Sequence, residues 1–138
     1  MRPVLPESAG MGVLRPAVAY FGAVFAVAFV IGMVRVLVLA PHLGAVLAVA
    51  LEVPIILIWS WFVAGWVLLR WPLDVLQRVG MGALAFGILM IAELGLSVLL
   101  FGQTAGGFVS GWGTLPGALG LTGQIGFAVV PMLRQGNG

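Results

Sequence analysis

The chain has 138 residues, of which 62% are hydrophobic and only 7% are charged, and its mean hydropathy is +1.23. A soluble domain carries roughly 25% charged residues because its surface must be wetted, so this composition excludes a soluble globular protein and favours a lipid bilayer. The six basic residues are all Arg and are scattered, which excludes the basic patch of a nucleic-acid-binding protein. Cysteine is absent, which excludes disulfides and thiolate metal sites.

Four stretches are long and apolar enough to cross a bilayer, which takes about 20 residues in a helix. An N-terminal segment rich in proline and glycine, residues 1–13, precedes them and is predicted to be a flexible tail. The first apolar stretch is too long for the core of a cleaved signal, so we expect it to remain as a span. The chain is predicted to be an all-α, polytopic membrane protein, a single four-helix domain over residues 1–138, with spans at 17–40, 44–69, 79–101 and 115–133.

Two connections and a short tail complete the predicted organisation. Residues 70–78 combine a proline suited to a helix start with Trp71 and aliphatic residues, and predict a short interfacial helix. Residues 102–114 predict an uncharged, glycine-rich outer loop of a length that is usually functional or disordered. Residues 134–138 are predicted to be a tail. The stretch 115–133 is diluted by polar and small residues, so a re-entrant segment is the alternative to a full span there.

The arginines predict the orientation of the bundle. With four crossings, one side receives five of the six arginines, and the loops on the other side contain none. Cytoplasmic loops carry the excess of basic residues in membrane proteins, so we expect both termini in the cytoplasm. The compact, Lys-free composition favours a bacterial cytoplasmic (inner) membrane. The five arginines are Arg2, Arg15, Arg70, Arg78 and Arg134.

Three charged residues fall within the predicted spans, and the topology places all of them in the outer half of the bilayer. At 1.5 Å per residue, Glu52 and Glu93 each lie about 12 Å from the outer ends of their spans. Arg35 lies about 7 to 8 Å from the outer end of its own span. Isolated charges at such depth cost at least about 2.5 kcal/mol each, so we expect the three to face inward and pair, with the Arg between the two carboxylates. Ser97, one turn after Glu93, and Gln124 from the fourth span are the candidates to join this polar cluster.

The cluster has two interpretations. In the structural one, Arg35 neutralises the acids and fixes the register of three helices. In the functional one, two acids and one base leave a net negative charge, so the cluster is an ion or proton site. Trp59 and Trp66 share a helix face with Glu52 and are either walls of a ligand pocket or packing and interfacial residues.

The polar residues suggest no enzyme chemistry, metal site or cofactor. The serines have no neighbouring His or Lys, and there is no phosphate loop or dinucleotide motif. We expect a non-enzymatic membrane protein that acts through helix–helix contacts, as an accessory subunit of a larger complex or as a homo-oligomer, with the bilayer, other membrane subunits or itself as partners. The alternatives are an oligomeric transporter or channel for protons or cations that uses Glu52 or Glu93, and an intramembrane lipid-modifying enzyme.

Overall fold

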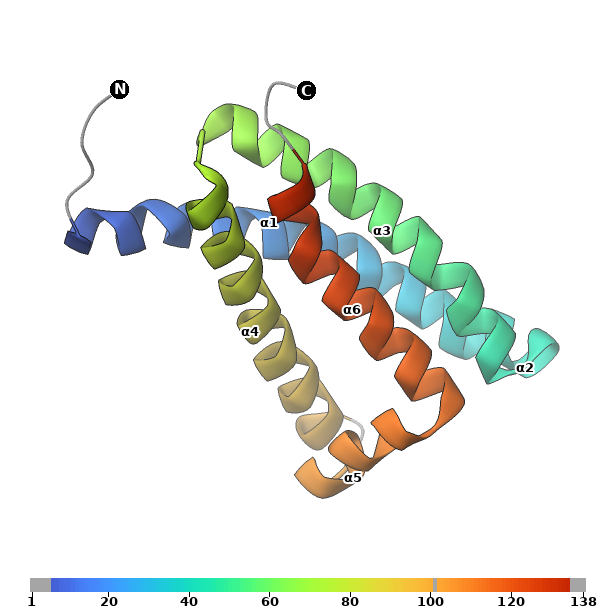
Figure 1. Ribbon diagram of the computed structural model, residues 1–138. Coiled ribbons are helices and arrows are strands. Elements are labelled where there is room, and N and C mark those ends of the chain that lie inside the picture. The colour runs from blue at the N-terminus through green and yellow to red at the C-terminus, as the bar shows by residue number, and fades with distance from the viewer. Residues whose placement is uncertain (1–5, 101, 135–138) are drawn as a thin grey trace.

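The computed structural model describes residues 6–100 and 102–134, and over these ranges the chain is helical with short connections (Figure 1). Four helical segments are long and apolar enough to cross a membrane. The first, Gly12–Leu43, runs through three elements in direct succession, and the others are single helices. The elements are α1 (Pro6–Val34), the π-helix η1 (Arg35–Leu39), α2 (Ala40–Leu43), α3 (Ala45–Arg70), α4 (Val75–Leu99), α5 (Ala105–Ser110), the 3₁₀-helix η2 (Gly111–Gly113) and α6 (Leu115–Leu133).

The four long helices form a ring in which α1 packs on α3, α3 on α6, α6 on α4 and α4 on α1. One end of the ring carries Arg70, Arg78 and Arg134 and is called the arginine end; the opposite end carries α2 and α5 and is called the loop end. Figure 1 shows the helices closest together where α3 and α6 finish and α4 begins, and diverging toward α2 and α5. The two ends of the bundle are therefore built differently.

Each of the four predicted spans falls on one of the four long helical segments, while the bounds of the first and third differ from the prediction by several residues. The fourth span, 115–133, has the same bounds as α6. Residues 6–13, predicted to be part of a flexible tail, are helical in α1, while residues 1–5 and 135–138 lie outside the described residues. The predicted outer loop contains α5 and η2.

The predicted interfacial helix at residues 70–78 does not form as a separate element. Val75 and the residues after it are the first turn of α4, and only residues 71–74 connect the two helices. The reason is a capping box. The backbone N–H of Gln77 donates to Asp74 Oδ1 at 2.8 Å, and the backbone N–H of Asp74 donates to Gln77 Oε1 at 3.1 Å. Such a box satisfies the unpaired amides at a helix start, so α4 begins here and continues without a break.

The core fills the half of the bundle next to the arginine end. Tyr20 and Met81 are fully buried there among small and branched side chains. A Cβ atom built on Gly82 would lie 1.9 Å from the carbonyl oxygen of Ala128, so only glycine permits this approach of α4 to α6. The buried core comprises Ala17, Tyr20, Val24, Val63, Ala64, Val67, Leu68, Met81, Ala85, Leu89, Phe127 and Val130.

A tyrosine connects α1 to α6, the helix opposite it in the ring. The Tyr20 ring stacks on Phe127 with centroids 4.5 Å apart and an interplanar angle of 4°. The Tyr20 hydroxyl donates to the Phe127 carbonyl at 2.5 Å. That carbonyl has no helical donor because the residue four positions on is Pro131, which lacks an amide hydrogen. Tyr20 thus satisfies a buried acceptor and joins the two helices across the ring.

The end of α6 packs on α3 through an arginine. Arg134 Nε donates to the Trp61 carbonyl at 3.2 Å, and its guanidinium lies 5.3 Å from the centroid of the Trp61 ring. A Cβ on Gly65 would lie 2.4 Å from Arg134 Nη2, so glycine leaves the space that the guanidinium occupies. This contact positions α6 against α3 at the arginine end.

Candidate functional site

The half of the bundle next to the loop end contains a hollow of about 460 Å³, called here the central hollow. Residues of α1, α3, α4 and α6 line its sides, and residues of α5 and η2 line its outer rim. Three core residues, Val24, Leu89 and Phe127, also line it and form its floor. The hollow therefore begins where the packed core ends.

One wall of the central hollow carries an ion pair between α1 and α3. Arg35 Nε lies 2.5 Å from Glu52 Oε1, and the two side chains are 31% and 14% exposed. Arg35 is the first residue of the π-helix η1, a wider turn in which the Ala40 amide donates to the Arg35 carbonyl. Pro41 lacks an amide hydrogen, so one α-helical hydrogen bond is already missing in this region. The switch from α-helical to π-helical hydrogen bonding is therefore less costly here.

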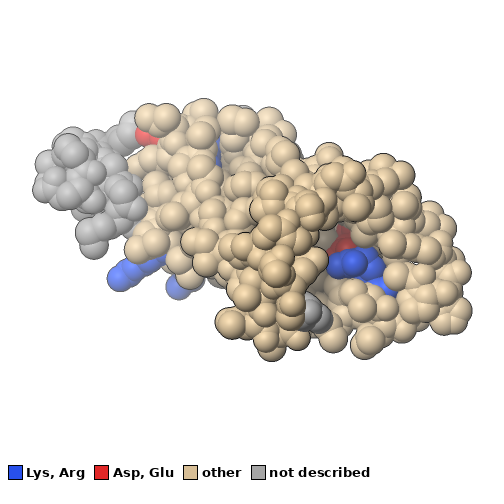
Figure 2. Space-filling model, turned by 90° about the horizontal axis from the view of Figure 1, so that it is seen from below, with Lys and Arg blue, Asp and Glu red and all other residues tan. Residues whose placement is uncertain are grey.

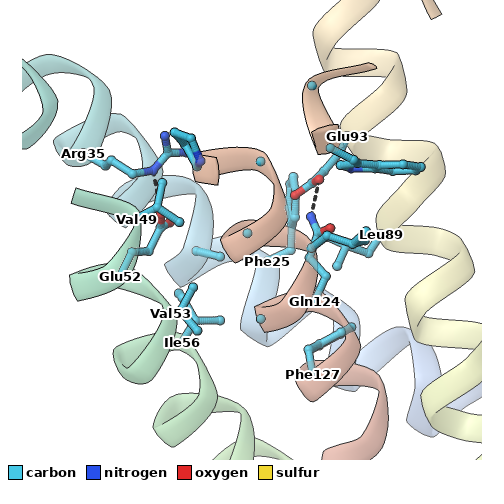
Figure 3. Close-up of a pocket in the computed structure, with 18 of the residues that line it drawn as sticks. Phe25, Arg35, Val49, Glu52, Val53, Ile56, Leu89, Glu93, Gln124 and Phe127 are labelled. Carbon is cyan, nitrogen blue, oxygen red and sulfur yellow. Dashed lines mark hydrogen bonds and ion pairs between the residues drawn. The ribbon is translucent and has the colours of Figure 1, made fainter. Parts of the chain in front are cut away.

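The second carboxylate lies on another wall of the hollow. Gln124 Nε2 of α6 donates to Glu93 Oε2 of α4. Figure 3 shows the Arg35–Glu52 pair and the Glu93–Gln124 pair on different sides of the hollow. The predicted arrangement, with Arg35 between two carboxylates, is thus replaced by two separate pairs. The reason is the ring order: α4 packs on α6, whereas α4 and α3 are not neighbours.

A second hollow of about 290 Å³, called the side hollow, lies between α1 and α4. It shares Arg35, Glu52 and Glu93 with the central hollow. Ser97, predicted as a partner of Glu93, lines this side hollow one turn beyond it. Gly32 lines the side hollow too, and the position of a Cβ on it is 3.7 Å from Arg35 Nη2. The charged groups are therefore reached both from the loop end and from the α1/α4 side.

Aromatic rings form much of the apolar wall, and they differ from the two tryptophans that the sequence suggests for a ligand wall. Phe21 and Phe25 of α1 stack with centroids 5.1 Å apart, and Phe108 and Trp112 meet edge to face at 5.5 Å. All four line the central hollow. The four-residue spacing of the two α1 rings was an available signal, since it places them on one helix face. Phenylalanine within a span is, however, equally typical of a lipid-facing surface.

The two tryptophans predicted as ligand-wall candidates line neither hollow. Trp59 Nε1 donates to the Ala23 carbonyl at 3.1 Å, so this ring packs α3 against α1. Trp66 is 56% exposed on the outside of the bundle. Trp59 is therefore a packing residue, and a ligand wall formed by the two rings stays a prediction.

Figure 2, a view from below that of Figure 1, shows the surface hollowed at a place where both basic and acidic atoms are visible. Among the described residues, no group of three His, Cys, Asp or Glu side chains lies close enough together to hold a metal ion. The central hollow has apolar and aromatic walls with a few polar groups among them, an arrangement typical of small-molecule sites. Comparisons with protein families, with characterised proteins and with solved structures found no match to this chain.

Proposed function

We propose that the chain is an integral membrane protein whose four long helices cross the bilayer with the arginine end in the cytoplasm. Large apolar side chains in the middle of these helices are exposed on the outside of the bundle, among them Phe62 at 62% and Ile91 at 75%. Exposed apolar surface of this extent is stable in lipid and not in water. The orientation follows from the arginines, because basic residues concentrate on the cytoplasmic side.

The orientation has a direct test, because the chain contains no cysteine to interfere. Cysteine is introduced singly at Ser110 in α5 or at Pro72 in the α3–α4 connection, both exposed. In intact cells, a membrane-impermeant maleimide is expected to label the Ser110→Cys variant only. Labelling of Pro72→Cys alone would reverse the orientation, and labelling of both or neither would contradict the four-span topology.

Within the membrane, we propose that the protein acts through helix–helix contacts, with a transmembrane helix of a second copy or of a partner subunit covering the opening between α1 and α4. The supporting observation is the side hollow, which leaves Arg35, Glu52 and Glu93 accessible from the side of the bundle. Charged groups facing lipid are costly, so an additional helix over this opening lowers the free energy. Ala28 and Gly32, one turn apart on α1, line the opening and provide the small-residue surface that favours close helix packing.

The test is the native mass of the full chain extracted in mild detergent, with every co-purifying chain identified. We expect a complex larger than the monomer. Gly32→Leu is expected to reduce it to monomer, because the added side chain projects into the opening. Gly22→Leu on the same helix is the control, since a Cβ there meets nothing within 4 Å and Gly22 does not line the opening. A monomer without co-purifying chains, or a complex that Gly32→Leu leaves intact, would overturn the proposal.

A further inference from the structure

The central hollow is lined by more acidic than basic side chains, and this imbalance indicates the charge of the ligand that it would bind. Arg35 is engaged by Glu52 at 2.5 Å, and the two neutralise each other. Glu93 on the other wall accepts a hydrogen bond from the neutral amide of Gln124. When the three groups are ionised, the hollow therefore carries one net negative charge, located at Glu93.

The aromatic rings around this charge favour the same kind of ligand. Phe21, Phe25, Phe108 and Trp112 line the hollow, and aromatic rings attract cations. An organic cation positioned among them gains this attraction in addition to its ionic contact with a carboxylate. The same rings also provide apolar area for the uncharged body of a ligand.

We propose that the central hollow is a binding site for an amphipathic organic cation, in which Glu93 is the counter-ion of the cationic head and the aromatic rings hold the apolar body. The volume of about 460 Å³ lies within the usual range for small-molecule pockets, roughly 300 to 1,000 Å³. An anionic ligand is disfavoured because Glu52 already neutralises Arg35, the cationic side chain on the lining, so no net positive charge is left to hold it. This inference goes beyond the proposed helix–helix function, and the site lies within one chain, so a monomer in detergent is expected to bind as well.

The first experiment compares three probes that share one apolar body. Benzyltrimethylammonium, benzylsulfonate and benzyl alcohol are titrated calorimetrically into the full chain in mild-detergent micelles, with empty micelles subtracted. The cation is expected to bind saturably with one site per chain, and at least about tenfold more tightly than the other two, as an ionic contact in a partly dry pocket implies. Equal binding of the three probes, tighter binding of the sulfonate, or no saturable binding of the cation would overturn the proposal.

The second experiment tests the counter-ion. Glu93→Gln keeps the shape of the side chain and removes its charge, and should weaken binding of the cation by about tenfold or more. Asp74→Asn is the matched control, because it neutralises a carboxylate at the arginine end while Asn still caps α4. Unchanged affinity in Glu93→Gln, or an equal loss in Asp74→Asn, would show that Glu93 is not the counter-ion.

A third variant tests where the ligand binds and leaves all charged side chains in place. Gly120 lines the hollow, and a Cβ on it meets nothing within 4 Å, so Gly120→Leu fills the space and clashes with nothing at its first atom. It should abolish measurable binding, whereas Gly87→Leu, which is equally open but outside the lining, should bind as the wild type does. Circular dichroism and elution volume show whether each variant is folded. Binding that survives in a folded Gly120→Leu variant would place the ligand elsewhere and overturn the assignment.

Discussion

The two halves of the bundle are formed by the same four helices, but one half is closely packed and the other encloses a hollow. Toward the arginine end, the inward positions hold Tyr20, Met81 and Phe127, and these side chains fill the space between the helices. Toward the loop end, aromatic, small, charged and polar side chains line the interior, and a hollow of about 460 Å³ remains. The helices diverge toward the loop end, and the side chains there line the space between them without filling it.

The polar groups of the two halves show the same contrast. In the packed half, the Tyr20 hydroxyl satisfies the one carbonyl that Pro131 leaves without a helical donor, and both are buried. In the open half, the polar groups pair in twos but stay partly accessible, as the 31% exposure of Arg35 shows. Groups that only hold a structure together have no need to remain accessible. The comparison supports a binding role for the open half and a structural role for the packed half.

The largest expected effect is at the closest helix contact of the packed half. In Gly82→Ala, the new methyl group meets the Ala128 carbonyl, a backbone atom that cannot move aside without displacing α6. We expect the free energy of unfolding to fall by about 3 kcal/mol, the upper end for overpacked sites. Unfolding in mixed micelles with increasing SDS, followed by circular dichroism, measures it. A loss below the reproducibility of the assay would mean that α4 and α6 do not approach this closely.

The next effect concerns the hydrogen bond between Tyr20 and Phe127. Tyr20→Phe keeps the stacked ring and leaves the Phe127 carbonyl without a donor, at an expected cost of about 2 kcal/mol for a buried unsatisfied group. Pro131→Ala restores an amide that can donate to the same carbonyl, so Tyr20→Phe should cost clearly less in that background. Equal costs in both backgrounds, measured by the same SDS unfolding, would exclude this explanation of the tyrosine.

A smaller effect is expected at the ion pair of the open half. Glu52→Gln deprives Arg35 of its charged partner, but Arg35 remains partly accessible and the hollow contains a second carboxylate. Polar contacts between helices in membranes contribute about 1 kcal/mol, and we expect a loss of that size. The matched Glu93→Gln variant should cost no more, because its partner is a neutral amide. A much larger loss in Glu52→Gln would make the pair a structural core of the bundle and weaken the contrast between the halves.

The sequence predicted the features that depend on one helix at a time. Span lengths follow from the need for about 20 apolar residues, and the fourth span, the most diluted of the four, was still placed at the bounds of α6. The start of α4 was mispredicted, although Asp74 followed three positions later by Gln77 is a recognisable capping pattern. Pro72 and Trp71 suggest a separate interfacial helix, but the cap at Asp74 determines where α4 begins.

Features that depend on which helices are neighbours were less accessible to sequence reasoning. The sequence brings Arg35, Glu52 and Glu93 to one depth, and all three line the central hollow, but it does not tell which side chain contacts Glu93 directly. Once α6 lies beside α4, Gln124 is the group that reaches Glu93. In the same way, Pro131 indicates that the Phe127 carbonyl needs a donor, but only the packing of α1 opposite α6 identifies Tyr20 as that donor.

The smallest predicted effect tests the openness of the hollow itself. Gly120→Ala adds a methyl group where a Cβ has no neighbour within 4 Å, so it should cause no clash. Glycine within a helix is less favourable than alanine by about 0.5 to 1 kcal/mol, so the free energy of unfolding should rise by a similar amount. The same substitution at Gly82 is expected to lower the free energy of unfolding. The two substitutions thus have opposite effects because one half is packed and the other is open. If Gly120→Ala were instead destabilising by SDS unfolding in micelles, the loop end would be packed as closely as the arginine end, and the binding site proposed there would lose its space.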